Sequence, residues 1–317
     1  MITYRLGVED LADMRFACSP LLETTTSLWA LRWPERYVLH LPWIRATRAA
    51  LAELDPADVA VLRALIGSTR GWLPDFVTPR PTSPLPDLSE ELGRVADTPP
   101  ARAAADIRAV YAAEPVPDLL RRSPASIAET LGRYWHRAVA PHWPRMRGVL
   151  EADMLHRARL LARDGAAAVF TDLDHRVRWT EGELRLYAGA GLDYEVDVAG
   201  RGLWLVPGLF VPQTISQVSP DEPPTVMYLA RGVGTLWETA DIRPPEALAE
   251  LVGRPRAVLL AGLDGPASTT ELARRLGVTP SAVSQQLGVL RRAGLVARTR
   301  AGRVVLYART ELGDRLV

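Results

Sequence analysis

The most constraining feature of this sequence is a pair of short amphipathic helices, predicted near the C-terminus and separated by only a few residues. In TTELARRLG, Leu272 and Leu276 fall on one helical face, and Gly277 offers the left-handed position that commonly ends a helix. Thr279 then provides an N-cap, and Pro280 a first-turn residue, for the helix SAVSQQLGVLRR. Two helices joined by so tight a turn are typical of a helix-turn-helix.

The second of these helices has two distinct faces. Val283, Leu287 and Leu290 recur at the spacing of a buried stripe. The opposite face carries short polar or small side chains near its start and two arginines at its end. Short side chains let a helix enter the major groove, where glutamine can bond bidentately to adenine, and arginines further along can contact phosphates.

Segments on either side complete a recognisable module. RPRAVLLAGLDG predicts a preceding helix, and Ser268 to Glu271 form a capping box. LVARTR and RVVLYAR predict two strands joined at Ala301-Gly302, which form a basic hairpin able to lie on a DNA backbone or in a minor groove. The sequence therefore predicts a winged helix-turn-helix. The predicted DNA-binding residues are Thr279, Ser281, Ala282, Ser284, Gln285, Gln286, Arg291, Arg292, Arg298, Arg300 and Arg303.

The charge distribution separates this module from the rest of the chain. The segment 254–317 holds eleven arginines and four acidic residues, a net charge of +7, so the preceding 253 residues carry −6 of the total of +1. A basic small domain beside an acidic large one is expected when only the small one meets a polyanion. We therefore divide the chain into an effector or dimerisation domain, residues 1–253, and a DNA-binding domain, residues 254–317.

The first domain is predicted to be mostly helical, with a small antiparallel sheet. ITYRL reads as a strand, and Ser19-Pro20 caps a helix that begins LLETTTS. The seven prolines between positions 74 and 100 favour an extended connection. Further helices follow, and after them the short alternating segments RVRWTEGELRLYA, LDYEVDVAG, RGLWLVPGLF and TVMYLARG, which favour hairpins. The predicted fold class is α+β.

The segment ASTTELARRLGVTPSAVSQQLGVLRRAGLVARTRAGRVVLYA resembles the DNA-binding domain of the ArsR family of bacterial transcription regulators. The resemblance covers about 60 of the 317 residues. The preceding part of the chain is similar to a domain of unknown function that accompanies this motif in a subgroup from high-GC bacteria. The segments that carry this similarity are SPLLE, SLWALR, APHWPRMRGVLEAD, GLWLVPGLF and MYLARG. The resemblance implies a DNA-binding regulator.

Three departures from the family pattern limit what the resemblance implies. The Cys-x-Cys pair of metal-sensing members is replaced by Ser268-Thr269-Thr270, so thiolate ligation there is excluded. The histidine usual in the recognition helix is Gln286. The C-terminal ELGDRLV leaves room for only two helical turns, whereas family members dimerise through a long helix; a dimer would need the first domain or the helix at Arg254.

One cluster in the first domain has two readings. The stretch 134–156 gathers three of the five histidines, and Asp153 and His156 are spaced to share a helix face, as metal or acid–base chemistry could use. Alternatively, its Trp and Tyr residues pack the core or line an effector pocket. Because no specific ligand or catalytic motif is present, we expect no metal, no cofactor and no enzymatic activity. The single cysteine, Cys18, is expected to be buried.

These patterns predict a sequence-specific transcription regulator, a repressor, whose partner is double-stranded operator DNA. We expect a homodimer in which the first domain dimerises, senses a small non-thiolate effector, or does both. With no leader sequence and no membrane span in the sequence, we expect a cytoplasmic protein that does not engage membranes. Two alternatives stay open: a winged helix that binds another protein, and an enzyme fused to a DNA-binding domain.

Overall fold

The computed structural model of the chain describes residues 1–112, 114–187, 193–217, 222–237, 244–263, 266–301 and 304–317. The chain divides into two units, Met1–Trp237 and Glu238–Val317. This division lies earlier than the expected boundary at Arg254. The reason is that helix α10 (Glu246–Val252) buries Leu248 in the apolar cluster that contains Leu259 and Leu287 of the second unit.

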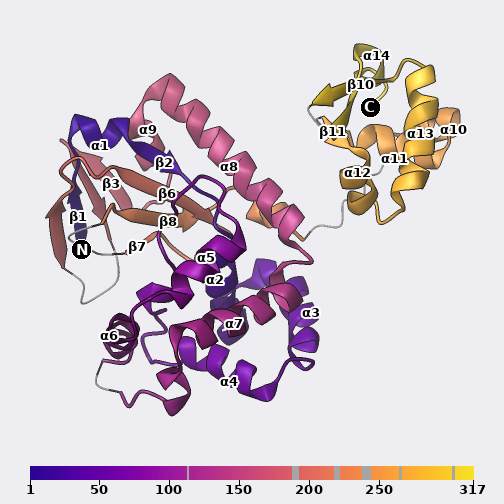
Figure 1. Ribbon diagram of the computed structural model, residues 1–317. Helices are drawn as coiled ribbons and strands as arrows, with labels where there is room; N and C mark the ends of the chain where they lie inside the picture. Colours follow the sequence, from indigo (N-terminus) through magenta and orange to yellow (C-terminus); the bar gives the residue numbers. More distant parts are fainter. Residues whose placement is uncertain (113, 188–192, 218–221, 238–243, 264–265, 302–303) are drawn as a thin grey trace. The chain divides into compact units, whose positions relative to one another are not determined.

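Helix α2 (Pro20–Arg32) lies at the centre of the helical part of the first unit (Figure 1). Every residue from Pro20 to Leu28 is buried, although the segment includes a carboxylate and four hydroxyls. The hydroxyls of Thr24 and Thr26 donate to backbone carbonyls one turn earlier, so the helix satisfies them itself. The predicted cap is confirmed, since Ser19 Oγ accepts a hydrogen bond from Leu22 N at 2.9 Å.

The other helical segments of the first unit group around α2 or, like α1 and α9, lie beside the strands (Figure 1). Their bounds are α1 (Val8–Ala12), η1 (Pro34–Arg36), η2 (Val38–His40), α3 (Leu41–Leu51), α4 (Pro56–Leu65), η3 (Asp75–Val77), α5 (Leu88–Ala96), α6 (Pro100–Tyr111), η4 (Asp118–Arg121), α7 (Pro124–Tyr134), the π-helix η5 (Trp135–Val139), α8 (Trp143–Asp164), α9 (Ala166–Thr171) and η6 (Val233–Thr235). The apolar core between them includes Leu21, Trp43, Leu65, Ile127 and Leu131.

Helix α5 corrects the prediction of an extended connection between positions 74 and 100. The prolines there bound the helix without entering it, and Val95 packs into the helical core. Its buried Glu91 accepts hydrogen bonds from Ser19 Oγ at 2.5 Å and from Leu21 N at 2.8 Å. The carboxyl group of Glu91 on α5 therefore bonds to donors at the N-terminus of α2 that the helix itself leaves without partners.

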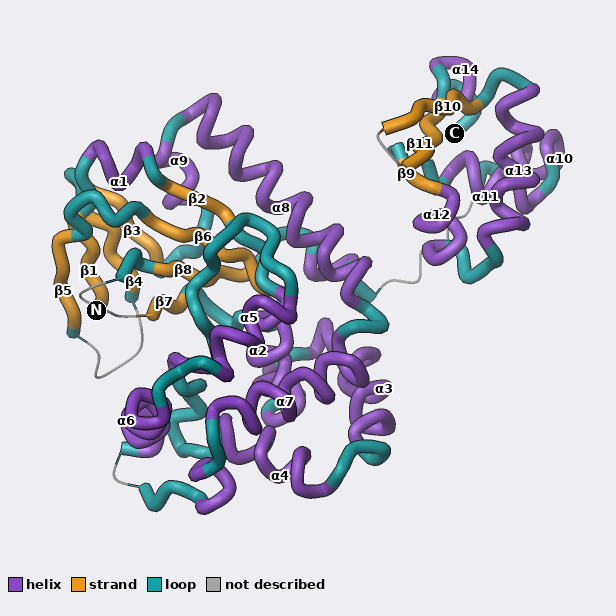
Figure 2. The backbone as a smooth tube through the Cα atoms, in the orientation of Figure 1, coloured by secondary structure: helices purple, strands orange, loops and turns teal. Residues whose placement is uncertain are grey.

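The strands of the first unit form two four-stranded sheets (Figure 2). One has the order β2-β6-β8-β7 and the other β3-β4-β1-β5. Their bounds are β1 (Ile2–Arg5), β2 (Met14–Phe16), β3 (Val177–Thr180), β4 (Glu183–Leu186), β5 (Tyr194–Asp197), β6 (Leu203–Gly208), β7 (Ile215–Gln217) and β8 (Thr225–Leu229). The α+β class is confirmed, but the small antiparallel sheet is not what forms. The pairs β1/β5, β2/β6 and β6/β8 are parallel, so both sheets are mixed.

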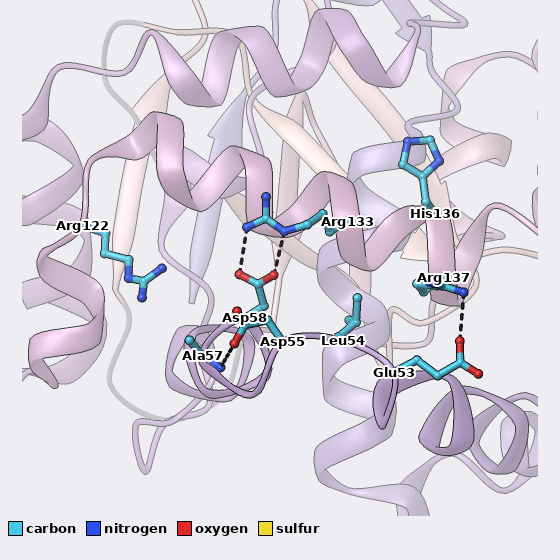
Figure 3. A pocket seen from close by; sticks show the side chains of 9 residues that line it. All are labelled: Glu53, Leu54, Asp55, Ala57, Asp58, Arg122, Arg133, His136 and Arg137. Carbon is cyan, nitrogen blue, oxygen red and sulfur yellow. Dashed lines mark hydrogen bonds and ion pairs between the residues drawn. The ribbon is translucent and has the colours of Figure 1, made fainter.

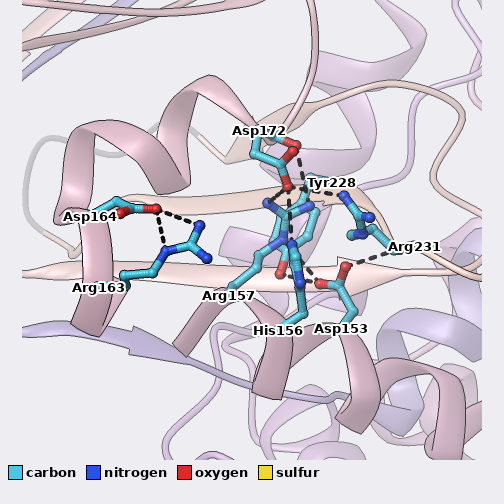
Figure 4. A network of polar contacts seen from close by, with 8 residues as sticks. All are labelled: Asp153, His156, Arg157, Arg163, Asp164, Asp172, Tyr228 and Arg231. Carbon is cyan, nitrogen blue, oxygen red and sulfur yellow. Dashed lines mark hydrogen bonds and ion pairs between the residues drawn. The ribbon is translucent and has the colours of Figure 1, made fainter. Parts of the chain in front are cut away.

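A buried ion pair within α8 forms a hydrogen bond with Tyr228 of strand β8 (Figure 4). Arg157 Nε donates to Asp153 Oδ2 at 3.1 Å, and both side chains are almost fully buried. Tyr228 Oη donates to the same carboxylate oxygen at 2.8 Å, and Arg231 N donates to the other at 3.0 Å. Burial, followed by the charge of Asp153, raises the pKa of Tyr228. The network holds the long helix against the sheet.

We expect Asp153→Asn to lower the free energy of unfolding by about 3–5 kcal/mol, because it leaves the Arg157 guanidinium buried without its nearest charge partner. Urea denaturation of the full chain measures this loss. Asp164→Asn on the same helix is the control, since its ion pair with Arg163 is exposed and should contribute little. Equal stability of the two variants would show that the buried pair does not hold α8.

The buried Glu23 of α2 should make the free energy of unfolding depend on pH. Its Oε1 accepts from Leu209 N at 2.8 Å, and burial raises the pKa of its carboxyl from 4.5 to about 8. Between these values the unfolded chain releases the proton while the folded chain keeps it, so stability falls as the pH rises.

Glu23→Gln should therefore flatten the decline in unfolding free energy between about pH 5 and pH 8. Part of the decline should persist, because burial also raises the pKa of Glu91 to about 7. Denaturant titrations across this range test the expectation, with Glu35→Gln at an exposed position as the control. An unchanged slope in Glu23→Gln would contradict it.

Candidate nucleic-acid interface

The turn between α12 (Thr269–Arg275) and α13 (Pro280–Arg292) has the predicted geometry. Gly277 adopts a left-handed conformation with φ of +65°, and Val278 N donates a hydrogen bond to Ala273 O at 3.0 Å. Thr279 Oγ1 accepts from Ala282 N at 3.3 Å and so caps α13. The predicted cap of α12 is present as well, since Ser268 Oγ accepts from Glu271 N at 3.2 Å.

The inward face of α13 supplies the centre of the second unit. Val283, Leu287 and Leu290 are at most 1% exposed and share a cluster with Leu260 and Leu272. The buried stripe read from the sequence is confirmed. The other described elements of this unit are α10, α11 (Arg254–Ala261), β9 (Ala267–Ser268), β10 (Val296–Ala301), β11 (Val304–Arg309) and α14 (Glu311–Asp314).

The outward face of α13 carries small or uncharged polar side chains that lead to an arginine at its end. Ser281, Gln285, Gly288 and Arg292 follow one another at helical spacing on the side opposite the core. Thr279, Ser281, Ala282, Ser284, Gln285, Arg291 and Arg292 are exposed, whereas Gln286 is half-buried at the edge of the inward face. This surface, which we call the α13 outer face, is free of acidic side chains. It therefore suits close approach of a polyanion.

A hairpin follows α13. Strands β10 and β11 pair antiparallel, and Arg298 and Arg300 lie two residues apart on β10, both exposed. Two-residue spacing places them on one face of the hairpin. Arg303 and the turn at Gly302 lie outside the described residues. Strand β9 adds a third strand beside β11, which the sequence did not reveal because two residues show no alternation.

Some arginines of this basic segment hold the fold together. Arg309 Nη1 donates to the carbonyl oxygens of Leu260 and Ala261, at 3.2 and 3.3 Å. Arg275 Nη1 donates to Gly262 O at 3.3 Å and pairs with Glu271. Both side chains satisfy carbonyl groups at the C-terminal end of α11. The positive charge of the segment is thus divided between structural arginines and those on the exposed face.

The histidine cluster of the first unit offers no ligand set. Both oxygens of Asp153 are already bonded to Arg157, Tyr228 and the Arg231 amide, while His156 Nε2 lies 3.6 Å from Asp172. Among the described residues, no three carboxylate, imidazole or thiol groups gather as a metal site. Tyr134 and Trp135 pack in the helical core.

Two further expectations concern the burial of Cys18 and the prediction of no membrane-spanning helix. Cys18 is 2% exposed, as predicted, and burial raises the pKa of its thiol. Within the described part of the chain, no helix has the length and apolar character needed to cross a bilayer.

Comparisons with known proteins agree with the geometry of the second unit. A helix-turn-helix domain family matches residues 245–299, so this unit is a helix-turn-helix domain. The chain is 45% identical over 62 residues to the HTH-type transcriptional regulator NmtR of Mycobacterium tuberculosis. The match covers 19% of this chain and 52% of that relative, so the chain spans about half the length of the relative. No solved structure matches the chain.

Two glycines provide a matched test of the turn. Gly277 and Gly288 both have room for a methyl group, but only Gly277 has positive φ. We expect Gly277→Ala to destabilise the second unit by about 1–2 kcal/mol and Gly288→Ala to stabilise it by up to about 1 kcal/mol. Amide hydrogen exchange of α12 and α13 in the full chain measures both. A stabilising Gly277→Ala would contradict the left-handed turn.

Proposed function

We propose that this chain is a sequence-specific transcription regulator, a repressor, that reads double-stranded DNA with α13 and contacts the backbone with the β10–β11 hairpin. The observation that carries the proposal is the α13 outer face, where Ser281 and Gln285 precede Arg292 on the side opposite the buried stripe. Short side chains admit the helix to the major groove, and the amide of Gln285 can pair with the edge of adenine.

Support also comes from the helix-turn-helix family match to residues 245–299 and from the similarity to a regulator over 62 residues. Thr279, Ser281, Ala282, Ser284, Gln285 and Gln286 are proposed to face bases or the adjoining backbone. Arg291, Arg292, Arg298, Arg300 and Arg303 are proposed to neutralise phosphates.

We further propose that the regulator is a homodimer on a pseudo-palindromic operator, with half-sites about one helical turn apart. The first unit would provide the dimer contacts, an effector site, or both. Ser268-Thr269-Thr270 precludes thiolate metal sensing at that position, so the effector would be of another kind.

Two substitutions separate base reading from phosphate contact. Gln285→Ala should cost roughly 1–3 kcal/mol of binding at the cognate operator and leave non-specific binding unchanged. Arg298→Ala should weaken binding to all DNA alike and lower the salt slope by about 1. Genomic fragments retained by the purified protein supply the operator, and gel shifts over a range of salt concentrations supply the affinities.

The control is Arg315→Ala, because Arg315 pairs with Glu311 on α14 and is not among the proposed contacts. It should keep the affinity and salt slope of the native protein. If the native chain retains no DNA at low salt, the regulator hypothesis fails, and a co-purifying protein would then favour a protein-binding winged helix.

A further inference from the structure

The first unit contains a pocket, lined mostly by charged residues, that the proposed DNA-binding function does not use (Figure 3). Its volume is about 590 Å³, within the range of small-molecule sites. It lies between the end of the α3–α4 connection and the start of α4, on one side, and Arg122, α7 and η5 on the other. Its walls include Leu54, Asp58, Arg122, Arg133, His136 and Arg137. We call it the Arg122 pocket.

Most charges in the Arg122 pocket are already paired. Asp58 is 4% exposed and accepts from Arg133 Nε at 2.7 Å and Nη2 at 2.9 Å, and Thr130 Oγ1 donates to it as well. Arg133, and to a smaller extent Arg122, hold the pKa of Asp58 below its ordinary value. Arg137 Nη1 donates to Glu53 Oε2 at 2.9 Å. The wall is therefore ordered by its own ion pairs before any ligand binds.

Arg122 is the exception. Its guanidinium makes no hydrogen bond or ion pair with the residues that the structure describes, although it is close enough to affect Asp58. Figure 3 shows it extending toward the side of the pocket that holds Asp58 and Arg133. Asp55, the remaining acid, accepts from Ala57 N and caps α4. The unused bonding capacity is thus mainly that of a cationic donor.

The backbone at the pocket wall is itself unusual. His136 and Arg137 stand on the π-helix η5, where Ala140 N bonds to Trp135 O at 2.8 Å. Trp43 Nε1 donates to Ala138 O at 2.9 Å and holds this wide turn in place. Single π-turns within helices are frequent at functional sites.

We propose that the Arg122 pocket binds a small organic carboxylate. Arg122 would clasp the carboxylate through two parallel N–H···O bonds, and Leu54 and Ala57 would contact its apolar part. The three arginines and three acids of the wall balance, so the pocket accepts one negative charge more readily than the two of a phosphate ester.

The pocket also has a physical route to the end of the first unit. Three residues after η5, the His142 ring packs edge-to-face on Trp237, 5.4 Å between centroids. Trp237 Nε1 also donates to His40 Nδ1 at 2.9 Å, and Trp237 is the last residue of the unit. A ligand that shifts η5 would change the packing of His142 on Trp237 at the end of the unit. We therefore infer that the carboxylate is the effector. That regulatory step rests on the proposed DNA-binding function; ligand binding itself does not.

Calorimetry on the full chain tests the site, with benzoate as the probe, benzamide as its neutral isostere and inorganic phosphate as the alternative anion. We expect millimolar binding of benzoate and none of benzamide. Arg122→Gln should weaken benzoate binding roughly tenfold or more. Arg121→Gln is the matched control, because its exposed side chain pairs with Asp118 outside the pocket. It should bind like the native chain.

Equal affinity of Arg122→Gln and the native chain, or no benzoate binding at millimolar concentration, overturns the site. Tighter binding of phosphate than of benzoate overturns the carboxylate assignment. A gel shift with retained genomic fragments then tests regulation: benzoate should change the DNA affinity of the native chain and not that of Arg122→Gln. Unchanged DNA affinity despite benzoate binding overturns the effector role. If the native chain binds benzoate but retains no DNA, the regulator function is refuted and the carboxylate site is not.

Discussion

The first unit depends on the burial of a polar helix. Glu23 on α2 accepts from the Leu209 amide just beyond β6, which ties the helical core to the sheet. The Leu209 carbonyl contacts His40 Nε2 at 3.0 Å, and His40 in turn accepts from Trp237. Burial lowers the pKa of His40 to about 4, so the ring is neutral and can act as donor and acceptor at once. One chain of hydrogen bonds thus runs from the core to the last residue of the unit.

The second unit is organised by a simpler rule. One helix, α13, provides both the centre of a small apolar core and an outer face of short polar side chains. These roles do not compete, because helical periodicity separates them by half a turn. Arg275 and Arg309 donate to carbonyl groups at the C-terminal end of α11, whereas Arg291, Arg292 and Arg298 are exposed and are proposed to contact phosphates.

Sequence reasoning succeeded where the determining interactions are local. Gly277, Thr279 and the stripe Val283, Leu287 and Leu290 were read correctly, because caps and helix periodicity depend on residues within a few positions of one another. It was wrong about α5, where flanking prolines hid a helix whose burial depends on distant contacts. It also placed α10 in the first domain, since nothing local shows that Leu248 packs against the second unit's core.

The sequence by itself determined the helix-turn-helix, the polar face of α13 and the charge contrast between the two parts of the chain. Only the tertiary structure decided that three strand pairs of the first unit are parallel and that both carboxylate oxygens of Asp153 are bonded within a buried network. It alone brought Arg122 beside Asp58. The physical reason is distance along the chain: strand pairing, buried ion pairs and pocket walls join residues far apart in sequence, and no local pattern specifies which partners meet.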